Sequence, residues 1–156
     1  MVIRSTAGNR LVSARELHVG PYETVVQPGE LVTEIQLPIV ARTGSAYQKV
    51  ERRVGDWSIV AVGAVLTLAA DGSIETAGIG LTAVGAPHFA APEAEAYLAG
   101  KPTTDEMFTQ AASIAAEHSN PVSDQRGPED YKRHLAGVLT ERALLKAAAR
   151  ARGDAA

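Results

Sequence analysis

The sequence contains no cysteine. This absence excludes disulfide bonds, thiolate metal sites and cysteine-ligated iron–sulfur clusters in this chain, and it fits a reducing compartment. Aromatic residues make up only 4% of the 156 residues, although the apolar fraction of 46% is that of a globular protein. A folded core therefore has to be built mainly from Ala, Val, Leu and Ile.

Long apolar runs and blocks of like charge are also missing. The longest apolar run, residues 59–70, is interrupted by Gly63 and Thr67, whereas a membrane-spanning helix needs about 18 apolar residues or more. The net charge is −3 without a charged block, so nucleic acid and anionic membranes are not expected partners. The first residues lack the apolar core of a secretion signal. These observations predict a soluble, cytoplasmic protein.

Signatures of hydrolytic and metal chemistry are equally scarce. The sequence has no HExxH motif and no nucleophile elbow. Its four histidines are scattered along the chain: His18, His88, His118 and His134. We therefore predict no catalytic residue and no metal site.

Residues 1–40 carry only short β-like runs. A Gly-Asn pair at residues 8–9 is a turn signal, and apolar residues alternate over 31–37, which predicts a strand that ends at Pro38. A sheet of so few short strands is marginal on its own. This part is therefore predicted to be the end of a domain, with the small, polar stretch 41–45 as its boundary.

Residues 41–156 are predicted to form a small α+β domain. Three β-like runs precede three helical stretches, which predicts a three-stranded antiparallel sheet packed against about three helices. The predicted strands are 46–53, 58–69 and 74–84, with an Asp-Gly hairpin signal at 71–72, and the predicted helices are 92–98, 104–118 and 128–150. The buried face of the last helix is predicted to contain Tyr131, Leu135, Val138, Leu139 and Leu145.

Charge is concentrated in the segment AYQKVERRVGDWSIV at residues 46–60. Four charged residues precede its turn: Lys49, Glu51, Arg52 and Arg53. Such a cluster is usually a solvated strand edge, and the alternative is that its cations face an acidic or phosphate-bearing partner. The loop 119–127 is typical of helix capping, and the alternative there is that Arg126 and Tyr131 dock a neighbouring subunit.

Three stretches together resemble the flavoprotein (medium) subunit of the xanthine dehydrogenase and aerobic carbon monoxide dehydrogenase family, the molybdenum hydroxylases. They are GSAYQKVERRVGDWSIVAVGAVL, LTAVGAPHFAAPEAEAYLAGK and PVSDQRGPEDYKRHLAGVLTERAL, in the family's order. The resemblance is nearest to the carbon monoxide dehydrogenase-like branch. It implies that residues 1–40 end an FAD-binding domain and that residues 41–156 form the C-terminal domain of a medium subunit.

The resemblance also implies a cofactor and partners. In the family, a molybdenum cofactor on a large subunit supplies electrons to two iron–sulfur clusters on a small subunit. FAD, which is bound non-covalently, takes the electrons from these clusters and passes them to NAD, a quinone or oxygen. The family's pyrophosphate-binding AGG-type and TxGG-type loops do not occur in this sequence. The FAD site is therefore expected to be incomplete, and the N-terminal half of the flavin domain is a further expected partner if it is encoded separately.

By the same resemblance, six positions are candidates for contact with the flavin: Tyr22, Val32, Gln48, Lys49, Arg53 and Asp56. Val32 would pack an aliphatic side chain beside the ring. Gln48 stands where relatives have a lysine, so it offers a hydrogen-bonding amide without the charge. The ordinary alternatives are fold support, with Val32 in a core and Arg53 paired with Asp56 across a tight turn.

Two functions from different classes follow. The first is part of a molybdenum hydroxylase flavoprotein subunit that relays electrons from iron–sulfur clusters through FAD to an acceptor, an oxidoreductase subunit that is not expected to be active alone. The second is a non-catalytic packing or interaction module that has lost FAD binding. An unrelated ligand-binding α+β domain is a third interpretation.

Overall fold

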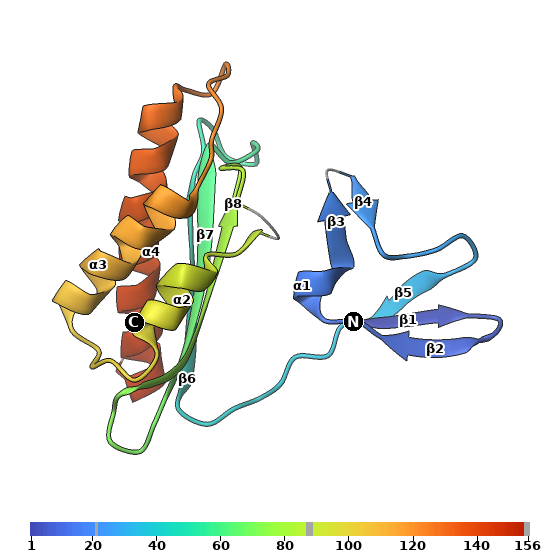
Figure 1. Ribbon diagram of the computed structural model, residues 1–156, viewed down its shortest axis with the longest axis horizontal. Coiled ribbons are helices and arrows are strands. Elements are labelled where there is room, and N and C mark those ends of the chain that lie inside the picture. Colours follow the sequence, from blue (N-terminus) through green and yellow to red (C-terminus); the bar gives the residue numbers. More distant parts are fainter. Residues whose placement is uncertain (21, 87–88, 155–156) are drawn as a thin grey trace. The chain divides into compact units, whose positions relative to one another are not determined.

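The computed structural model describes residues 1–20, 22–86 and 89–154, so His88 lies outside the described residues. Within this part the chain divides into two compact units, Met1–Ile39 and Val40–Ala156. We refer to them as unit 1 and unit 2 (Figure 1).

Unit 1 consists of short strands and one turn of helix. A three-stranded antiparallel sheet has the order β2-β1-β5, and a separate hairpin pairs β3 with β4. The strands are β1 (Val2–Ser5), β2 (Gly8–Leu11), β3 (His18–Gly20), β4 (Glu23–Thr24) and β5 (Leu31–Glu34). Helix α1 (Ala14–Leu17) begins with a capping box, in which the side chains of Ser13 and Glu16 accept each other's backbone N–H groups.

The sheet of unit 2 has longer strands. β6 (Thr43–Val50), β7 (Val60–Leu68) and β8 (Ile74–Thr82) pair antiparallel in the order β6-β7-β8. The β7–β8 turn contains the predicted Asp-Gly pair, with Gly72 at φ 84°. Glycine adopts this left-handed conformation without steric cost, and Asp71 closes the turn by accepting two hydrogen bonds from Ser73.

Within the described residues, three helices cover one face of this sheet: α2 (Pro92–Leu98), α3 (Asp105–His118) and α4 (Glu129–Arg152). α4 packs on β6 and β7, α2 packs on β8, and α3 packs against both helices. Thr104 caps α3 by accepting the Met107 N–H, and Gly153 ends α4 at φ 83°. The predicted α+β class, with a three-stranded antiparallel sheet against three helices, is confirmed.

Small residues allow α4 to lie close to β6. A Cβ atom on Gly44 would lie 2.2 Å from the carbonyl oxygen of Ala147 and 2.3 Å from the amide nitrogen of Ala151. The buried face of α4 is rich in alanine, including Ala136, Ala143, Ala147, Ala148 and Ala151. The core of unit 2 therefore relies on close backbone approach more than on large side chains.

The structure corrects several details predicted from the sequence. β5 ends at Glu34 rather than at residue 37, and β6 spans 43–50 rather than 46–53, so part of the predicted linker belongs to the sheet. The predicted buried face of α4 is wrong at Tyr131 and Leu145, which are 41% and 37% exposed. Alanines face the sheet instead, because the close approach at Gly44 leaves room only for small side chains.

Candidate functional site

One face of the unit 2 sheet carries no helix in the described part of the chain, and we call it the outer sheet face. Side chains alternate between the two faces of a strand. Gln48 pairs with Val62, which is fully buried under the helices, so Gln48 lies on the helix side. Tyr47 and Lys49 therefore lie on the outer sheet face, and the adjacent predicted residues Gln48 and Lys49 point in opposite directions.

In the middle of the outer sheet face, the aromatic ring of Tyr47 lies beside the backbone of glycine residues. Tyr47, Gly63 and Gly80 lie in one row across β6, β7 and β8. A Cβ atom on Gly63 would meet the Tyr47 ring at 3.9 Å and nothing nearer, and Tyr47 is 63% exposed. In the next row a Cβ atom on Gly78 would collide with Val65 Cγ1 at 2.8 Å. A flat backbone surface next to an exposed phenol ring suits contact with a planar aromatic group.

Lys49 is tied to the loop between β6 and β7. Its Nζ donates to the backbone carbonyl of Asp56 at 2.8 Å and forms an ion pair with Glu51. The Lys49 side chain is 30% exposed. The ammonium group of Lys49 is thus held by the β6–β7 loop, at the edge of the outer sheet face.

Asp56 organises the same loop. Its Oδ1 accepts the Trp57 backbone N–H at 2.8 Å, and its Oδ2 lies 3.7 Å from Arg52 Nε and 3.9 Å from Arg53 Nε. The Trp57 hydrogen bond, with the nearby charges of Arg53, Arg52 and Arg126, holds the pKa of Asp56 below its usual range. The Arg53–Asp56 contact expected from fold support is therefore present, as an ion pair longer than a hydrogen bond.

The α3–α4 loop packs onto this loop from the same end of unit 2 (Figure 1). Arg126 Cζ lies 5.9 Å from the centroid of the Trp57 ring, a distance at which a cation and an aromatic face attract each other. The Arg126 backbone N–H donates to Asp124 Oδ1 at 2.7 Å, and that oxygen lies 2.8 Å from Nζ of Lys132, whose side chain is only 3% exposed. Arg126 therefore makes its contacts within unit 2.

The other two predicted flavin positions lie in unit 1. Tyr22 is 99% exposed at φ 62°, and Val32, in β5, is 42% exposed. The alternative that Val32 belongs to a core is therefore wrong. Its side chain shares a face of the sheet with Ile3, its partner on β1.

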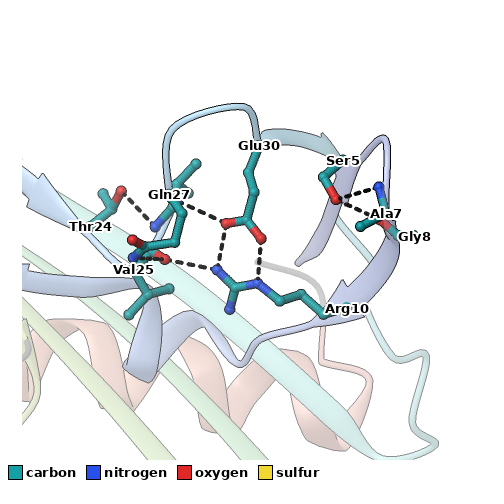
Figure 2. A network of polar contacts seen from close by, with 9 residues as sticks. Ser5, Ala7, Gly8, Arg10, Thr24, Val25, Gln27 and Glu30 are labelled. Atoms are coloured by element: carbon teal, nitrogen blue, oxygen red, sulfur yellow. Dashed lines mark hydrogen bonds and ion pairs between the residues drawn. The ribbon is translucent and has the colours of Figure 1, made fainter.

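A polar network holds the loop before β5 (Figure 2). Arg10 donates from Nε and Nη2 to the two carboxylate oxygens of Glu30 at 2.8 and 2.7 Å, and from Nη2 to the Val25 carbonyl at 2.7 Å. Glu30 also accepts the Gln27 backbone N–H at 2.8 Å. The hydrogen bonds from Arg10 and then Gln27 lower the pKa of Glu30 to about 2. This bidentate pair fixes the chain where it enters β5.

Among the described residues, no group of three or more His, Asp or Glu side chains is arranged to hold a metal ion. No helix in the same part of the chain combines the length and apolarity needed to cross a membrane. His118 pairs its Nδ1 with Glu93 Oε2 at 2.8 Å, which links α3 to α2.

Sequence reasoning does not single out Tyr47, Gly63 or Trp57. The alternation in β6 indicates that Tyr47 and Gln48 face opposite sides, but the pattern of one strand does not say which side the helices cover. The available signal was the set of glycines in neighbouring strands, which often marks a close approach to the sheet. It becomes specific only when the register places Gly63 and Gly80 beside Tyr47.

Comparison with known proteins gives consistent matches. Residues 45–147 match the family described as the CO dehydrogenase flavoprotein C-terminal domain. The chain is 39% identical to the carbon monoxide dehydrogenase medium chain of Afipia carboxidovorans, over 93% of this chain and 50% of the relative. It is 33% identical to the glyceraldehyde dehydrogenase medium chain of Sulfolobus acidocaldarius, over 95% and 52%.

A solved structure matches as well. Carbon monoxide dehydrogenase from Hydrogenophaga pseudoflava contains a chain that superposes with a TM-score of 0.87 at 37% identity, over 96% of this chain and 52% of that one. The chain therefore spans about half the length of the curated relatives it matches.

Proposed function

Because the chain belongs to the CO dehydrogenase flavoprotein C-terminal domain family, we propose that it is the C-terminal part of a flavoprotein medium chain in a molybdenum hydroxylase complex. Its role in that complex is electron relay, in which FAD receives electrons from iron–sulfur clusters and passes them to an acceptor. The observation that carries the proposal is the family match over residues 45–147. The family membership expected from the sequence is confirmed, and the relay is what we propose.

The outer sheet face fits the ring of a flavin. Tyr47 exposes a phenol ring, and Gly63 leaves the adjoining backbone without a side chain. A planar ring can stack on such a surface, which then keeps water from one side of it. When bound, the isoalloxazine ring of FAD supplies the one- and two-electron chemistry of the relay.

The residues of this chain do not provide for the pyrophosphate of FAD. The family's two glycine-rich pyrophosphate loops do not occur in the sequence. We therefore assign to this chain only contacts with the ring, and to the N-terminal half of the flavin domain the contacts with the pyrophosphate.

The six candidate flavin contacts differ in how far their placement supports them. Lys49 points to the outer sheet face and bonds to Asp56, so these two form the polar edge of the proposed surface. Gln48 lies on the helix side and receives the least support. Arg53 extends from the same loop and is 83% exposed. The roles of Tyr22 and Val32, in unit 1, remain predictions from the resemblance.

The proposed partners are the molybdenum-cofactor large subunit and the iron–sulfur small subunit, together with the N-terminal half of the flavin domain if it is encoded separately. The assignment of residues 1–40 to the end of an FAD-binding domain and of residues 41–156 to the C-terminal domain is part of the same proposal. The cytoplasmic location remains a prediction from the sequence. The competing function, a packing module that has lost FAD, predicts the same fold without flavin binding.

A chimera tests the proposal directly. The N-terminal half of a carbon monoxide dehydrogenase medium chain is joined to residues 1–156, and the product is assembled with the large and small subunits of that enzyme. We expect the assembly to retain FAD, measured by flavin absorbance, and its flavin to be reduced when the enzyme's substrate is added. Tyr47→Ala should lower FAD occupancy, and Tyr47→Phe should preserve it because the ring remains.

Thr76→Ala is the matched control, since Thr76 lies on the same face two rows from Tyr47 and is exposed. A chimera that assembles but holds no FAD would support the packing module instead. Equal loss of FAD in Tyr47→Ala and Thr76→Ala would remove the outer sheet face from the proposal.

A further inference from the structure

The outer sheet face has a polar end and an apolar end. Its middle row is that of Tyr47, and side chains two residues away along each strand form the neighbouring rows. Lys49 lies in the row on one side of Tyr47, and Val65 lies in the row on the other side, opposite Ser45. The two outer rows are four residues apart along an extended strand, which is about 13 Å.

Val65 is an apolar side chain left open on the central strand. Within β6, β7 and β8, all of which belong to the described part of the chain, the exposed large apolar side chains are those of Tyr47 and Val65. Val65 is 40% exposed, and its Cγ1 would lie 2.8 Å from a Cβ atom on Gly78, so this valine leans over glycine backbone. Tyr47 and Val65 therefore belong to one apolar surface in adjacent rows.

The Lys49 end of the face is closed and polar. Ala61, the partner of Lys49 on β7, is 1% exposed, so the sheet is already covered in that row. The Lys49 ammonium donates to the Asp56 carbonyl and forms an ion pair with Glu51. An ammonium group has three N–H donors, so these two contacts leave one donor for an acceptor on a ligand.

A flavin ring has ends that match this surface. The isoalloxazine ring is planar and elongated, with carbonyl oxygens at its pyrimidine end and two methyl groups on the benzene ring at the other end. Burying methyl carbons against a valine is favourable, whereas burying a carbonyl oxygen there without a donor costs free energy. The reverse direction would place the methyl groups at Lys49 and the carbonyl oxygens on Val65. The two ends of the face therefore favour one direction of the ring.

We propose that Val65 positions the flavin by receiving the methyl-bearing end of its ring, an inference that rests on the proposed function and adds a contact to it. Val65 is not one of the six positions that the family resemblance implies. It is a positioning residue, because it supplies neither charge nor a proton and fixes only which end of the ring lies at Lys49. Tyr47 and Gly63 can stack a ring without Val65, but they do not distinguish its two directions.

A flavin analogue tests this inference. FAD and an analogue that lacks both ring methyl groups are titrated into the flavin-free form of the chimera described above, and flavin fluorescence gives the two dissociation constants. We expect the chimera to bind FAD at least about fourfold more tightly than the analogue, the effect of one buried methyl group. Val65→Thr replaces a methyl group with a hydroxyl and should reduce this preference to about twofold or less.

Two control variants accompany Val65→Thr. Val122→Thr makes the same substitution at an exposed valine of the α3–α4 loop and should keep both the affinity for FAD and the preference for its methyl groups. Lys49→Met removes the donor at the polar end, so it should weaken the binding of both flavins by a similar factor and leave the preference unchanged. Val65→Thr should keep the circular dichroism of the unmodified chimera, because threonine suits an exposed strand position.

Four outcomes would overturn the inference. The first is that the unmodified chimera and Val65→Thr have the same preference between the two flavins. The second is that Val122→Thr reduces the preference as much as Val65→Thr. The third is that Lys49→Met abolishes the preference and Val65→Thr does not, because the ring would then lie in the opposite direction. These three outcomes occur in a chimera that binds FAD and leave the proposed function standing. The fourth, a chimera that binds neither flavin, would contradict the proposed function as well.

Discussion

The guanidinium of Arg126 lies over the indole ring of Trp57, with Arg126 Cζ 5.9 Å from the ring centroid. This contact joins the α3–α4 loop to the β6–β7 loop, whose Asp56 also lies within the influence of the Arg126 charge. Two segments far apart in the sequence thus support each other beside the outer sheet face. The contact can be followed in solution because Trp57 is the only tryptophan of the chain.

Arg126→Ala should loosen this end of unit 2. We expect the free energy of unfolding to fall by about 0.5–1 kcal/mol, the usual size of a partly exposed cation–π contact. The fluorescence of Trp57 should change with it, measured in the native state and through a urea titration. Arg126→Lys keeps a cation near the ring and should lose less. Identical tryptophan spectra in all three proteins would contradict the contact.

Removing the charge of Asp124 should lower the stability of the protein more than removing the charge of Lys132. The lysine is 3% exposed and lies 2.8 Å from a carboxylate that is 38% exposed. Asp124→Asn leaves a buried cation without its counter-ion and should cost about 2 kcal/mol, whereas Lys132→Met leaves a carboxylate that water can solvate and should cost less than about 1 kcal/mol. Urea unfolding of both variants measures the two losses of stability. A larger loss in Lys132→Met than in Asp124→Asn would contradict the prediction.

Gly44 should tolerate no side chain. Its Cβ atom would lie 2.2 Å from the carbonyl oxygen of Ala147, so Gly44→Ala has to push α4 away from β6. We expect a loss of about 3 kcal/mol or more in unfolding free energy. Gly63→Ala is the control, because its Cβ atom would meet the Tyr47 ring at an ordinary 3.9 Å. The control should change stability by about 1 kcal/mol or less. Thermal unfolding of the Gly44→Ala and Gly63→Ala variants measures both changes in stability, and equal changes would contradict the prediction.

Unit 1 should lose stability in acid as Glu30 is protonated. Its pKa is about 2 in the folded chain against an ordinary value of 4.5. Between these values the unfolded chain binds the proton more strongly, so the contribution of Glu30 is complete above about 4.5 and disappears as the pH falls toward about 2. Side-chain NMR of Glu30 should follow this titration. Arg10→Gln should raise the midpoint, and Arg4→Gln should not, since Arg4 bonds to Asn9 instead.

Much of the fold follows from local patterns. The Asp-Gly pair at 71–72 places the β7–β8 turn, and the predicted helix starts at 92 and 104 lie within a residue of the observed ones. Strand ends are less predictable because they depend on a partner: β5 stops at Glu34 although the apolar alternation continues. Tyr131 fits the period of a buried helix face but is 41% exposed, because periodicity does not reveal how closely the helix packs.

The candidate site divides in the same way. The charged segment of residues 46–60 is visible in the sequence, and so is the family that its motifs resemble. The sequence does not show which of Tyr47 and Gln48 faces the uncovered side of the sheet. That depends on where α4 lies, and α4 is positioned by its contact with Gly44.

The amino-acid sequence by itself determined the order and type of the elements, the absence of thiol chemistry and the family, since each depends on residue identity and short-range spacing. Only the tertiary structure decided where the side chains of the charged segment lie. Packing of α4 leaves Tyr47 and glycine backbone on the outer sheet face, while Lys49, Asp56 and the Trp57–Arg126 contact hold the loop beside it. The Trp57–Arg126 contact and the packing of α4 on Gly44 join residues distant in sequence, and only long-range packing brings such residues together.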